Sequence, residues 1–285
     1  MNKASIAIVT YNREDKLERA IRSCFTHLDY IDEIVIVDNA SSDNTAKLVD
    51  SISIDSPIPI SLIRTHKNIG CPRARNLSIA NCKNKYVYCL DDDGWLDKET
   101  LRSSLNVVEE DVAVVVSRIV EPKSELDMGL VGKKRDVGKF SGGASLIDKD
   151  MFLKLGGFPD FFRQMEESHV SLMLLSNNKR IVFNPESKMF HEKIKSTRQN
   201  QEEARYNYLN EMRVIQKLFS LWMFIPLLML KSISHARIYW KCKSIGIFLG
   251  DFLSSLILPL TKPLELVKKN DKLPLRVLLK QRRLK

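Results

Sequence analysis

The stretch YVYCLDDDGW, Tyr86 to Trp95, places three consecutive carboxylates directly behind an apolar run. The residues Tyr86 to Leu90 are typical of a buried β-strand. Neighbouring carboxylates repel one another, so a strand end that carries Asp91, Asp92 and Asp93 is expected to gain something specific, such as a divalent cation or a helix cap. The segments on either side must decide between these two interpretations.

Apolar segments rich in β-branched residues alternate with segments of helical periodicity through the first part of the chain. Leu17, Ala20, Ile21 and Cys24, for example, recur at helical spacing between the first two strand-like segments. This alternation is typical of a parallel sheet covered by helices on both faces, and therefore of an α/β fold. Strands are expected at 5–10, 33–38, 60–63, 86–90, 112–117 and 180–183.

Polar residues close three of the predicted strands: Thr10-Tyr11-Asn12, Asp38-Asn39 and Asp91-Asp92-Asp93. Ligands of open α/β sheets bind beyond the carboxyl ends of the strands, so we expect these residues to converge on a small-molecule site. No glycine occurs before Gly70. The first strand-helix turn therefore has neither the dinucleotide-binding fingerprint nor a P-loop, which disfavours classical NAD enzymes and P-loop kinases.

The net charge of +10 is unevenly distributed. From Arg213 onward there are fifteen Lys or Arg residues and three acidic residues, a balance of +12, so residues 1–212 sum to −2. Nucleic acid is therefore not expected as a partner of the main body. The five cysteines are scattered without a CxxC pair, and the apolar run at 5–10 is too short for a signal peptide. We expect reduced thiols and a cytoplasmic protein.

Three further groups are candidates for chemistry, and each also has a structural interpretation. Oxygen ligands such as Asp91 and Asp93 suit Mg²⁺ or Mn²⁺, although acidic residues are also common in turns. Glu166-Glu167 opens a predicted helix, where acidic side chains favour the first turn, but such a pair also suits a general base. His191 is a structural histidine or a ligand, and Arg75 lies on a solvated helix face or faces a diphosphate.

Eight motifs follow one another along the chain. They are IVTYNR (8–13), IVIVDNASSDNT (34–45), NIGCPRARN (68–76), YVYCLDDDGW (86–95), FSGGASLI (140–147), GGFPDFF (156–162), EESHVSLML (166–174) and Phe190-His191. This ordered set resembles the family 2 glycosyltransferases of the GT-A fold over roughly two thirds of the chain. The resemblance implies a Rossmann-like nucleotide-sugar-binding domain with a mixed, mainly parallel sheet.

By this resemblance each matching position has an implied role. The nucleoside would be held by Thr10, Tyr11, Asn12 and Asp38, and the rest of the donor by Arg75, Asp91 and Asp92. The metal, Mn²⁺ or Mg²⁺, would be held by Asp91, Asp93 and His191, and the acceptor would approach Gly142 and Gly143. The family's base is usually a Glu-Asp pair followed by another acid, whereas this chain has Glu166-Glu167-Ser168-His169. Glu167 is the expected base, with Glu166 as the second candidate.

The implied activity is inverting, metal-dependent transfer of a hexosyl or rhamnosyl group from a nucleotide-sugar to a hydroxyl of a saccharide, which is expected to be lipid-linked and part of surface polysaccharide or glycolipid synthesis. A glutamate removes the acceptor proton while the cation offsets charge on the departing diphosphate. Two alternatives remain: a sugar nucleotidyltransferase, and a membrane-bound nucleotide-sugar-binding scaffold that has lost catalysis.

The chain is expected to divide into a GT-A catalytic domain at 1–205, with a nucleotide-sugar half (1–95) and an acceptor half (96–205), and a basic amphipathic helical tail at 206–285. Neither apolar segment of the tail, 218–230 or 245–257, is long and clean enough to span a bilayer. With nearby cations such as Lys231, Lys243, Lys268 and Lys269, the tail suits helices that lie on an anionic membrane at its cytoplasmic face. The alternative is a helical subdomain that packs on the catalytic body or on a second copy of the chain.

Overall fold

The computed structural model describes residues 2–192, 197–242, 244–261 and 272–284. Its centre is a nine-stranded sheet with the order β3-β2-β1-β4-β8-β6-β9-β5, and β7 pairs with β9 outside this path. The strands are β1 (Ala4–Thr10), β2 (Ile31–Asp38), β3 (Ile60–Arg64), β4 (Tyr86–Asp91), β5 (Gly94–Leu96), β6 (Val112–Val120), β7 (Arg135–Asp136), β8 (Ala144–Asp148) and β9 (Arg180–His191).

Most strands of this sheet run in one direction. β1 pairs in parallel with both β2 and β4, β2 with β3, and β6 with β9. β8 lies antiparallel between β4 and β6, and β5 and β7 are each antiparallel to β9. The expectation of a mixed, mainly parallel sheet is therefore confirmed. β9 is longer than the predicted strand at 180–183 and reaches His191.

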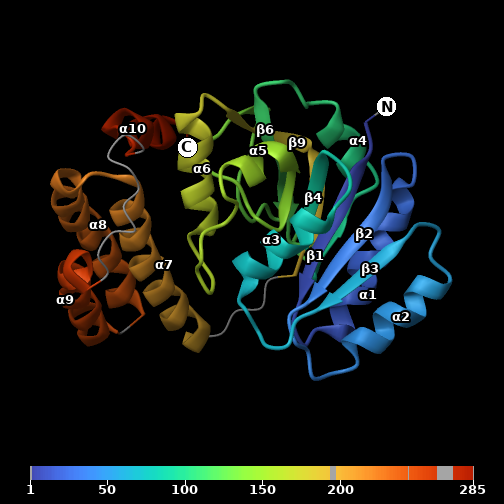
Figure 1. Ribbon diagram of the computed structural model, residues 1–285, viewed down its shortest axis with the longest axis horizontal. Helices are drawn as coiled ribbons and strands as arrows, with labels where there is room; N and C mark the ends of the chain where they lie inside the picture. The colour runs from blue at the N-terminus through green and yellow to red at the C-terminus, as the bar shows by residue number, and fades with distance from the viewer. Residues whose placement is uncertain (1, 193–196, 243, 262–271, 285) are drawn as a thin grey trace.

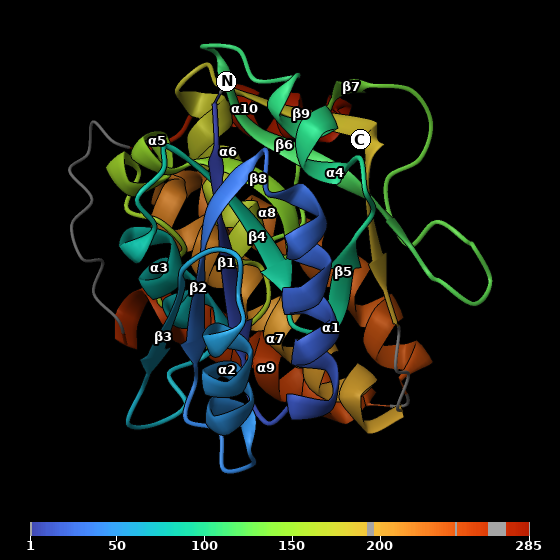
Figure 2. The same cartoon turned by 90° about the vertical axis from the view of Figure 1, so that its right-hand side faces the viewer.

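Helices cover both faces of the sheet (Figures 1 and 2). One buried cluster joins the sheet to α1 (Glu14–Cys24), α2 (Thr45–Ile54) and α4 (Thr100–Leu105), and a second joins it to α3 (Cys71–Asn81), α5 (Lys149–Lys154) and α6 (Glu166–Ser176). A short 3-10 helix, η1 (Phe25–His27), follows α1. The predicted apolar stripe of α1 is fully buried, as its helical spacing requires.

The described residues after β9 include the helices α7 (Thr197–Leu218), α8 (Leu221–Lys241), α9 (Ile245–Thr261) and α10 (Leu275–Arg283). In Figure 1, α7 lies between the body (residues 2–192) and the pair α8 and α9, and α10 packs against α6. A third buried cluster combines Phe161, Leu172 and Leu175 of the body with apolar residues of these helices. The tail therefore packs on the body, as the interpretation of the tail as a helical subdomain predicted.

Three details bear on the expectations for the tail. The expected domain boundary at 205/206 lies inside α7. Within the ranges that the structure describes, no helix combines the length and the apolar character that crossing a bilayer requires. Lys243, Lys268 and Lys269 lie outside the described residues.

Candidate functional site

Strand register brings the predicted site residues to one edge of the sheet. Thr10, the last residue of β1, pairs with Asp38, the last residue of β2. At the end of β9, His191 pairs with Gly94, which directly follows Asp93. A cavity of about 360 Å³ opens at this edge. It is lined by Val9, Thr10, Tyr11, Arg13, Asn39, Asn68, Gly70, Cys71, Arg75, Asp91, Asp92, Asp93, Phe162, Arg163 and His191.

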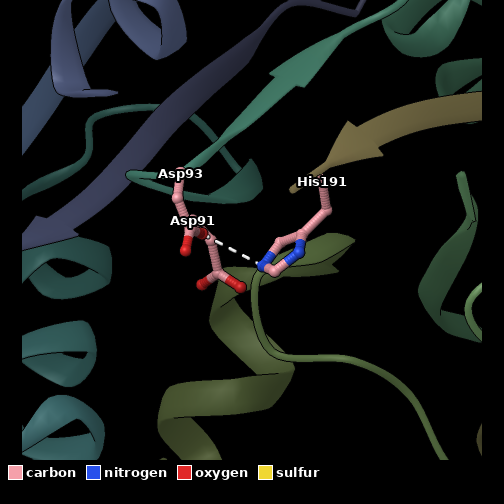
Figure 3. Close-up of side chains that lie close together, drawn as sticks. All are labelled: Asp91, Asp93 and His191. Carbon is pink, nitrogen blue, oxygen red and sulfur yellow. Dashed lines mark ion pairs between the residues drawn. The ribbon is translucent and has the colours of Figure 1, made fainter. Parts of the chain in front are cut away.

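Asp91, Asp93 and His191 form a cluster that could hold a metal ion. One ligand atom from each lies within 4.8 Å of the other two, a spacing that bonds of about 2 Å to a shared ion can span after small side-chain shifts. Figure 3 shows the imidazole facing the two carboxylates, with His191 Nε2 3.0 Å from Asp93 Oδ1. Two carboxylates and one imidazole are a donor set that suits a divalent cation such as Mn²⁺.

Arg13 pairs with the second and third carboxylates of this turn. Its Nη1 donates to Asp93 Oδ2 and lies 3.8 Å from Asp92 Oδ1. Burial by itself would raise the pKa of Asp93, but the hydrogen bond from His191 and the charge of Arg13 lower it to about 2. Burial raises the pKa of Asp92 to about 7, against the effect of Arg13. Asp93 is therefore ionised at neutral pH, as a metal ligand must be, whereas Asp92 is only partly ionised.

The first carboxylate meets a different set of partners. Arg75 Nη2, in a buried position on α3, donates to Asp91 Oδ1 at 2.7 Å. A Cβ at Gly143 would collide with the Asp91 carboxylate, and a Cβ at Gly142 would lie 2.8 Å from Glu167 Oε1. The backbone N–H of Gly142 donates to this same Glu167 oxygen at 3.1 Å. The two glycines therefore allow the backbone to approach both the metal cluster and the expected base.

Glu166 and Glu167 open α6 in different surroundings. Glu166 is 5% exposed, and its Oε2 is buried without a hydrogen-bond partner among the residues that the structure describes. Burial, and then the charge of Glu167, raise the pKa of Glu166 to about 7. A pKa of about 7 would suit a general base. A base must also lie within hydrogen-bond distance of the proton that it removes, and the buried Glu166 carboxylate is poorly placed for this. Glu167 is partly exposed and contacts Gly142 beside Arg75, so geometry favours Glu167.

Asp38 and Asn12, two of the predicted nucleoside residues, hold a loop and do not line the cavity. Asp38 is fully buried and accepts hydrogen bonds from the Ser41 N–H at 2.8 Å and from Arg64 Nε at 2.9 Å. Asn12 Oδ1 accepts from the Ser42 N–H at 2.8 Å. A carboxylate oxygen accepts more than one hydrogen bond, so the contact of Asp38 with a base stays a prediction.

Asn39 was expected at this site as a strand-end residue, and the cavity confirms that placement. Arg13, Asn68 and Phe162 also line the cavity; they stand inside the quoted motifs but were given no role of their own. Arg163 lies outside these motifs, and no local pattern indicated what holds Phe162 and Arg163, because their partners lie far along the chain. The Phe162 ring stacks on Tyr206 of α7 with centroids 6.4 Å apart, and Arg163 Nη2 donates to Glu202 of α7 at 2.9 Å. Helix α7 therefore supports one wall of the cavity.

Comparisons with known proteins add a family assignment. The family model described as "Glycosyl transferase family 2" matches residues 5–165. An uncharacterized glycosyltransferase of Haemophilus influenzae is 24% identical over 188 residues, which cover 60% of this chain and 61% of that protein. The poly(ribitol-phosphate) beta-N-acetylglucosaminyltransferase TarS of Staphylococcus aureus is 26% identical over 114 residues, which cover 39% of this chain and 19% of TarS. The chain thus spans less than two thirds of the length of these relatives.

Solved structures are similar at low sequence identity. Mannosyltransferase PcManGT from Pyrobaculum calidifontis, in complex with GDP-Man and Mn²⁺, matches with a TM-score of 0.64 and 16% identity, covering 99% of this chain and 84% of its own. S. aureus TarS 1–349 in complex with UDP matches with a TM-score of 0.56 and 17% identity, covering 73% of this chain and 64% of its own. At such identities the likeness shows the fold, which is a mixed α/β fold of the GT-A type.

Proposed function

The chain belongs to glycosyl transferase family 2, and from this premise we propose that it transfers a sugar from a nucleotide diphosphate-sugar to a hydroxyl group of a saccharide acceptor. Donor binding is supported by the similar structures of TarS and PcManGT, which contain UDP and GDP-Man. Thr10 and Tyr11 line the cavity at the end of β1 and are the proposed nucleoside contacts, together with Asn12 and Asp38, which do not line it. Family membership also favours transfer of a glycosyl group over transfer of a nucleotidyl group.

The cluster of Asp91, Asp93 and His191 is the single observation that carries the proposal. It lies in the cavity beside Arg75, and we propose that it holds Mn²⁺ or Mg²⁺. A cation bound there supplies positive charge that offsets the charge developing on the departing nucleoside diphosphate. Arg13 donates to Asp93 Oδ2, so a cation held by Asp93 would share this carboxylate with the guanidinium. Two similar structures, PcManGT and GalNAc-T7, contain Mn²⁺.

Glu167 is the proposed base. Its Oε1 is oriented by the Gly142 N–H, and its partly exposed carboxylate can accept the proton of an acceptor hydroxyl. Gly142 and Gly143 are themselves buried, and the side chains of Arg75, Glu167 and Asp91 fill the space in front of them, so their proposed contact with the acceptor would be indirect. The hydroxyl oxygen then bonds to the anomeric carbon as the bond to the diphosphate breaks on the opposite side. This single displacement inverts the anomeric configuration, and no covalent nucleophile is needed.

The proposed acceptor is a lipid-linked saccharide of surface polysaccharide synthesis. Two relatives have names from polymer synthesis, the poly(ribitol-phosphate) beta-N-acetylglucosaminyltransferase TarS and the succinoglycan biosynthesis protein ExoO of Rhizobium meliloti, which supports a polymeric acceptor. Exposed apolar side chains on α8 and α9 support docking on an anionic membrane, at its cytoplasmic face. One cation counted in favour of docking is otherwise engaged, because Lys231 pairs with Glu211.

A panel of UDP-, dTDP- and GDP-sugars, with and without Mn²⁺, tests this function. We expect one nucleotide type to raise the melting temperature in the presence of Mn²⁺ and the matching sugar donor to be hydrolysed slowly without acceptor. Asp93→Ala should abolish both effects, whereas Asp50→Ala, which removes an exposed carboxylate on α2, should leave them unchanged. Stabilisation without hydrolysis would favour the non-catalytic scaffold, and no stabilisation by any donor would contradict the proposal.

A further inference from the structure

The acceptor still lacks a binding surface of its own. Gly142 and Gly143 are buried behind side chains, so they offer it no open face. An acceptor hydroxyl must reach Glu167, and the rest of the acceptor must then lie against a neighbouring wall of the cavity. The end of β1 is the proposed contact of the nucleoside, whereas the wall that contains Phe162 and Arg163 belongs to the loop that leads into α6 and Glu167.

Phe162 presents an aromatic surface at this wall. It lines the cavity and is 48% exposed, although its ring stacks on the Tyr206 ring with the two planes inclined by 28°. Tyr206 of α7 is itself partly exposed. The two rings form an aromatic platform that begins in the cavity and continues onto α7. Such rings offer a large, rigid contact face, which costs little conformational entropy when a ligand binds.

Two charged side chains border the aromatic platform. The Arg163 guanidinium carbon lies 4.9 Å from the centre of the Tyr206 ring, and Arg163 Nη2 donates to Glu202 Oε2 of α7 at 2.9 Å. Arg163 is partly exposed and Glu202 is exposed. Because the two charges pair with each other, this border favours a neutral ligand over an ion, yet a guanidinium and a carboxylate can each make further hydrogen bonds.

The backbone at Phe162 is held on both sides. The Cys71 N–H donates to the Phe162 carbonyl at 3.1 Å, and a Cβ at Gly70 would lie only 2.6 Å from this carbonyl oxygen. From the side of α7, Asn210 Nδ2 donates to the Arg163 carbonyl at 2.7 Å. The aromatic platform is therefore preorganised, which reduces the cost of ordering it when a ligand binds.

We propose that the aromatic platform binds a neutral sugar ring of the acceptor, an inference that rests on the proposed glycosyl transfer. A pyranose ring carries C–H groups on its faces and hydroxyl groups around its edge. The C–H groups pack on Phe162 and Tyr206, and the hydroxyl groups bond to Arg163 and Glu202. This contact holds the acceptor while its attacking hydroxyl reaches Glu167.

Saturation-transfer NMR on the full-length chain tests this site with neutral trisaccharides as probes, namely maltotriose, cellotriose and triacetylchitotriose. UDP, GDP, dTDP and Mn²⁺ are present, so that the nucleotide part of the cavity is filled. Phe162→Leu and Tyr206→Leu keep an apolar side chain but remove the flat ring, whereas Phe162→Tyr keeps the ring. The matched control is Trp240→Leu, which removes an exposed aromatic ring of α8 that does not line the cavity.

We expect at least one trisaccharide to bind the wild type. Each of Phe162→Leu and Tyr206→Leu should weaken its affinity about threefold to tenfold, because a stacking contact is lost. Phe162→Tyr and Trp240→Leu should change the affinity less than about twofold.

The proposal is overturned if no trisaccharide binds, if the leucine variants of the platform bind as well as the wild type, or if Phe162→Tyr or Trp240→Leu loses as much affinity as they do. Nucleotide binding is measured on the same samples as the rise in melting temperature. An equal loss of nucleotide binding in Phe162→Leu would also overturn the proposal, because Phe162 would then contact the donor or maintain the fold. Failure of the transferase function looks different, since no nucleotide-sugar would then stabilise even the wild type.

Discussion

At the scale of single residues, Glu167 and Glu166 differ in exposure: the Glu167 carboxylate is partly exposed and open to an acceptor, whereas Glu166 is buried. Glu167→Gln keeps the shape of the side chain and its hydrogen bond from Gly142 but cannot take up a proton. We expect kcat to fall about 100-fold or more, because general base catalysis contributes about that factor. Donor binding, measured by titration calorimetry, should change less than about twofold. Glu166→Gln is the matched control. If kcat falls further in Glu166→Gln than in Glu167→Gln, Glu166 is the base and the proposed assignment is wrong.

His169 makes a prediction about stability at low pH. It is 4% exposed, neither ring nitrogen has a hydrogen-bond partner among the described residues, and burial, followed by the charge of Lys217, lowers its pKa to about 4. Its usual pKa is about 6.5. Above that pH both the folded and the unfolded chain hold a neutral ring, so no stability is lost. Between pH 6.5 and 4 only the unfolded chain takes up the proton, and stability falls by about 2 kcal/mol at pH 5.

His169→Leu should remove this loss. Thermal melting at pH 8 and pH 5 would show a smaller difference in Tm for the variant than for the wild type. His66→Leu, the same substitution at an exposed histidine, serves as the matched control for the difference in Tm. An identical pH dependence in wild type and His169→Leu would contradict the assignment of a buried neutral ring.

At the scale of elements, α7 holds the loop that leads into Glu166 and the proposed base, Glu167. Gln164 and Met165 adopt left-handed backbone angles, with φ values of 70° and 69°, which non-glycine residues rarely adopt. Asn210 of α7 is buried, and its Nδ2 donates to the carbonyls of Arg163 at 2.7 Å and Gln164 at 3.1 Å. Glu166 and Glu167 follow this loop directly, so Asn210 fixes where α6 begins.

Asn210→Ala should therefore act on catalysis as well as on stability. Leaving the two carbonyls without this donor costs about 1–3 kcal/mol, and kcat should fall severalfold at temperatures well below the Tm, with donor affinity unchanged. Asn184→Ala is a matched control, since Asn184 is also buried and donates to a backbone carbonyl, that of Ser103. Equal kcat in the two variants would show that Asn210 has only a stabilising role.

At the scale of the whole molecule, the apolar character of the tail is divided between two surfaces. Phe248 of α9 is buried in the third cluster, whereas Leu249 and Leu253 are exposed. α8 shows an exposed stripe at helical spacing that extends along its length, and its two tryptophans are 92% and 74% exposed. The stripe consists of Trp222, Ile225, Met229, Ile233 and Trp240. This arrangement fits a helical layer that packs on the body on one side and on a lipid surface on the other.

Flotation with lipid vesicles tests that arrangement in the intact chain. The wild type should float with phosphatidylglycerol vesicles, and the double variant Trp222→Gln/Trp240→Gln should bind at least about tenfold more weakly, because two large apolar side chains are lost from the interface. Ile54→Gln, which changes an exposed apolar residue of α2, is the control. Deleting the tail is a poorer test, since it would expose Phe161, Leu172 and Leu175 of the body. Equal flotation of all three proteins would contradict membrane docking through α8.

The sequence by itself predicted six of the nine strands and the edge of the sheet where the site forms, but not β5, β7 or β8, which are short strands without an alternating apolar pattern of their own. The periodicity of apolar residues and the polar residues at strand ends can both be read from short stretches of sequence. Parallel strands bring their carboxyl ends to the same edge of the sheet, so these patterns are enough to place Thr10, Asp91 and Asp93 near one another. The tertiary structure alone decided which charges pair, such as Arg13 with Asp93 and Lys231 with Glu211. It also decided that α7 supports the loop before Glu166 and Glu167 and that the tail has two apolar sides. These contacts join segments distant in the chain, and they depend on how whole elements pack, which residue type and spacing do not specify.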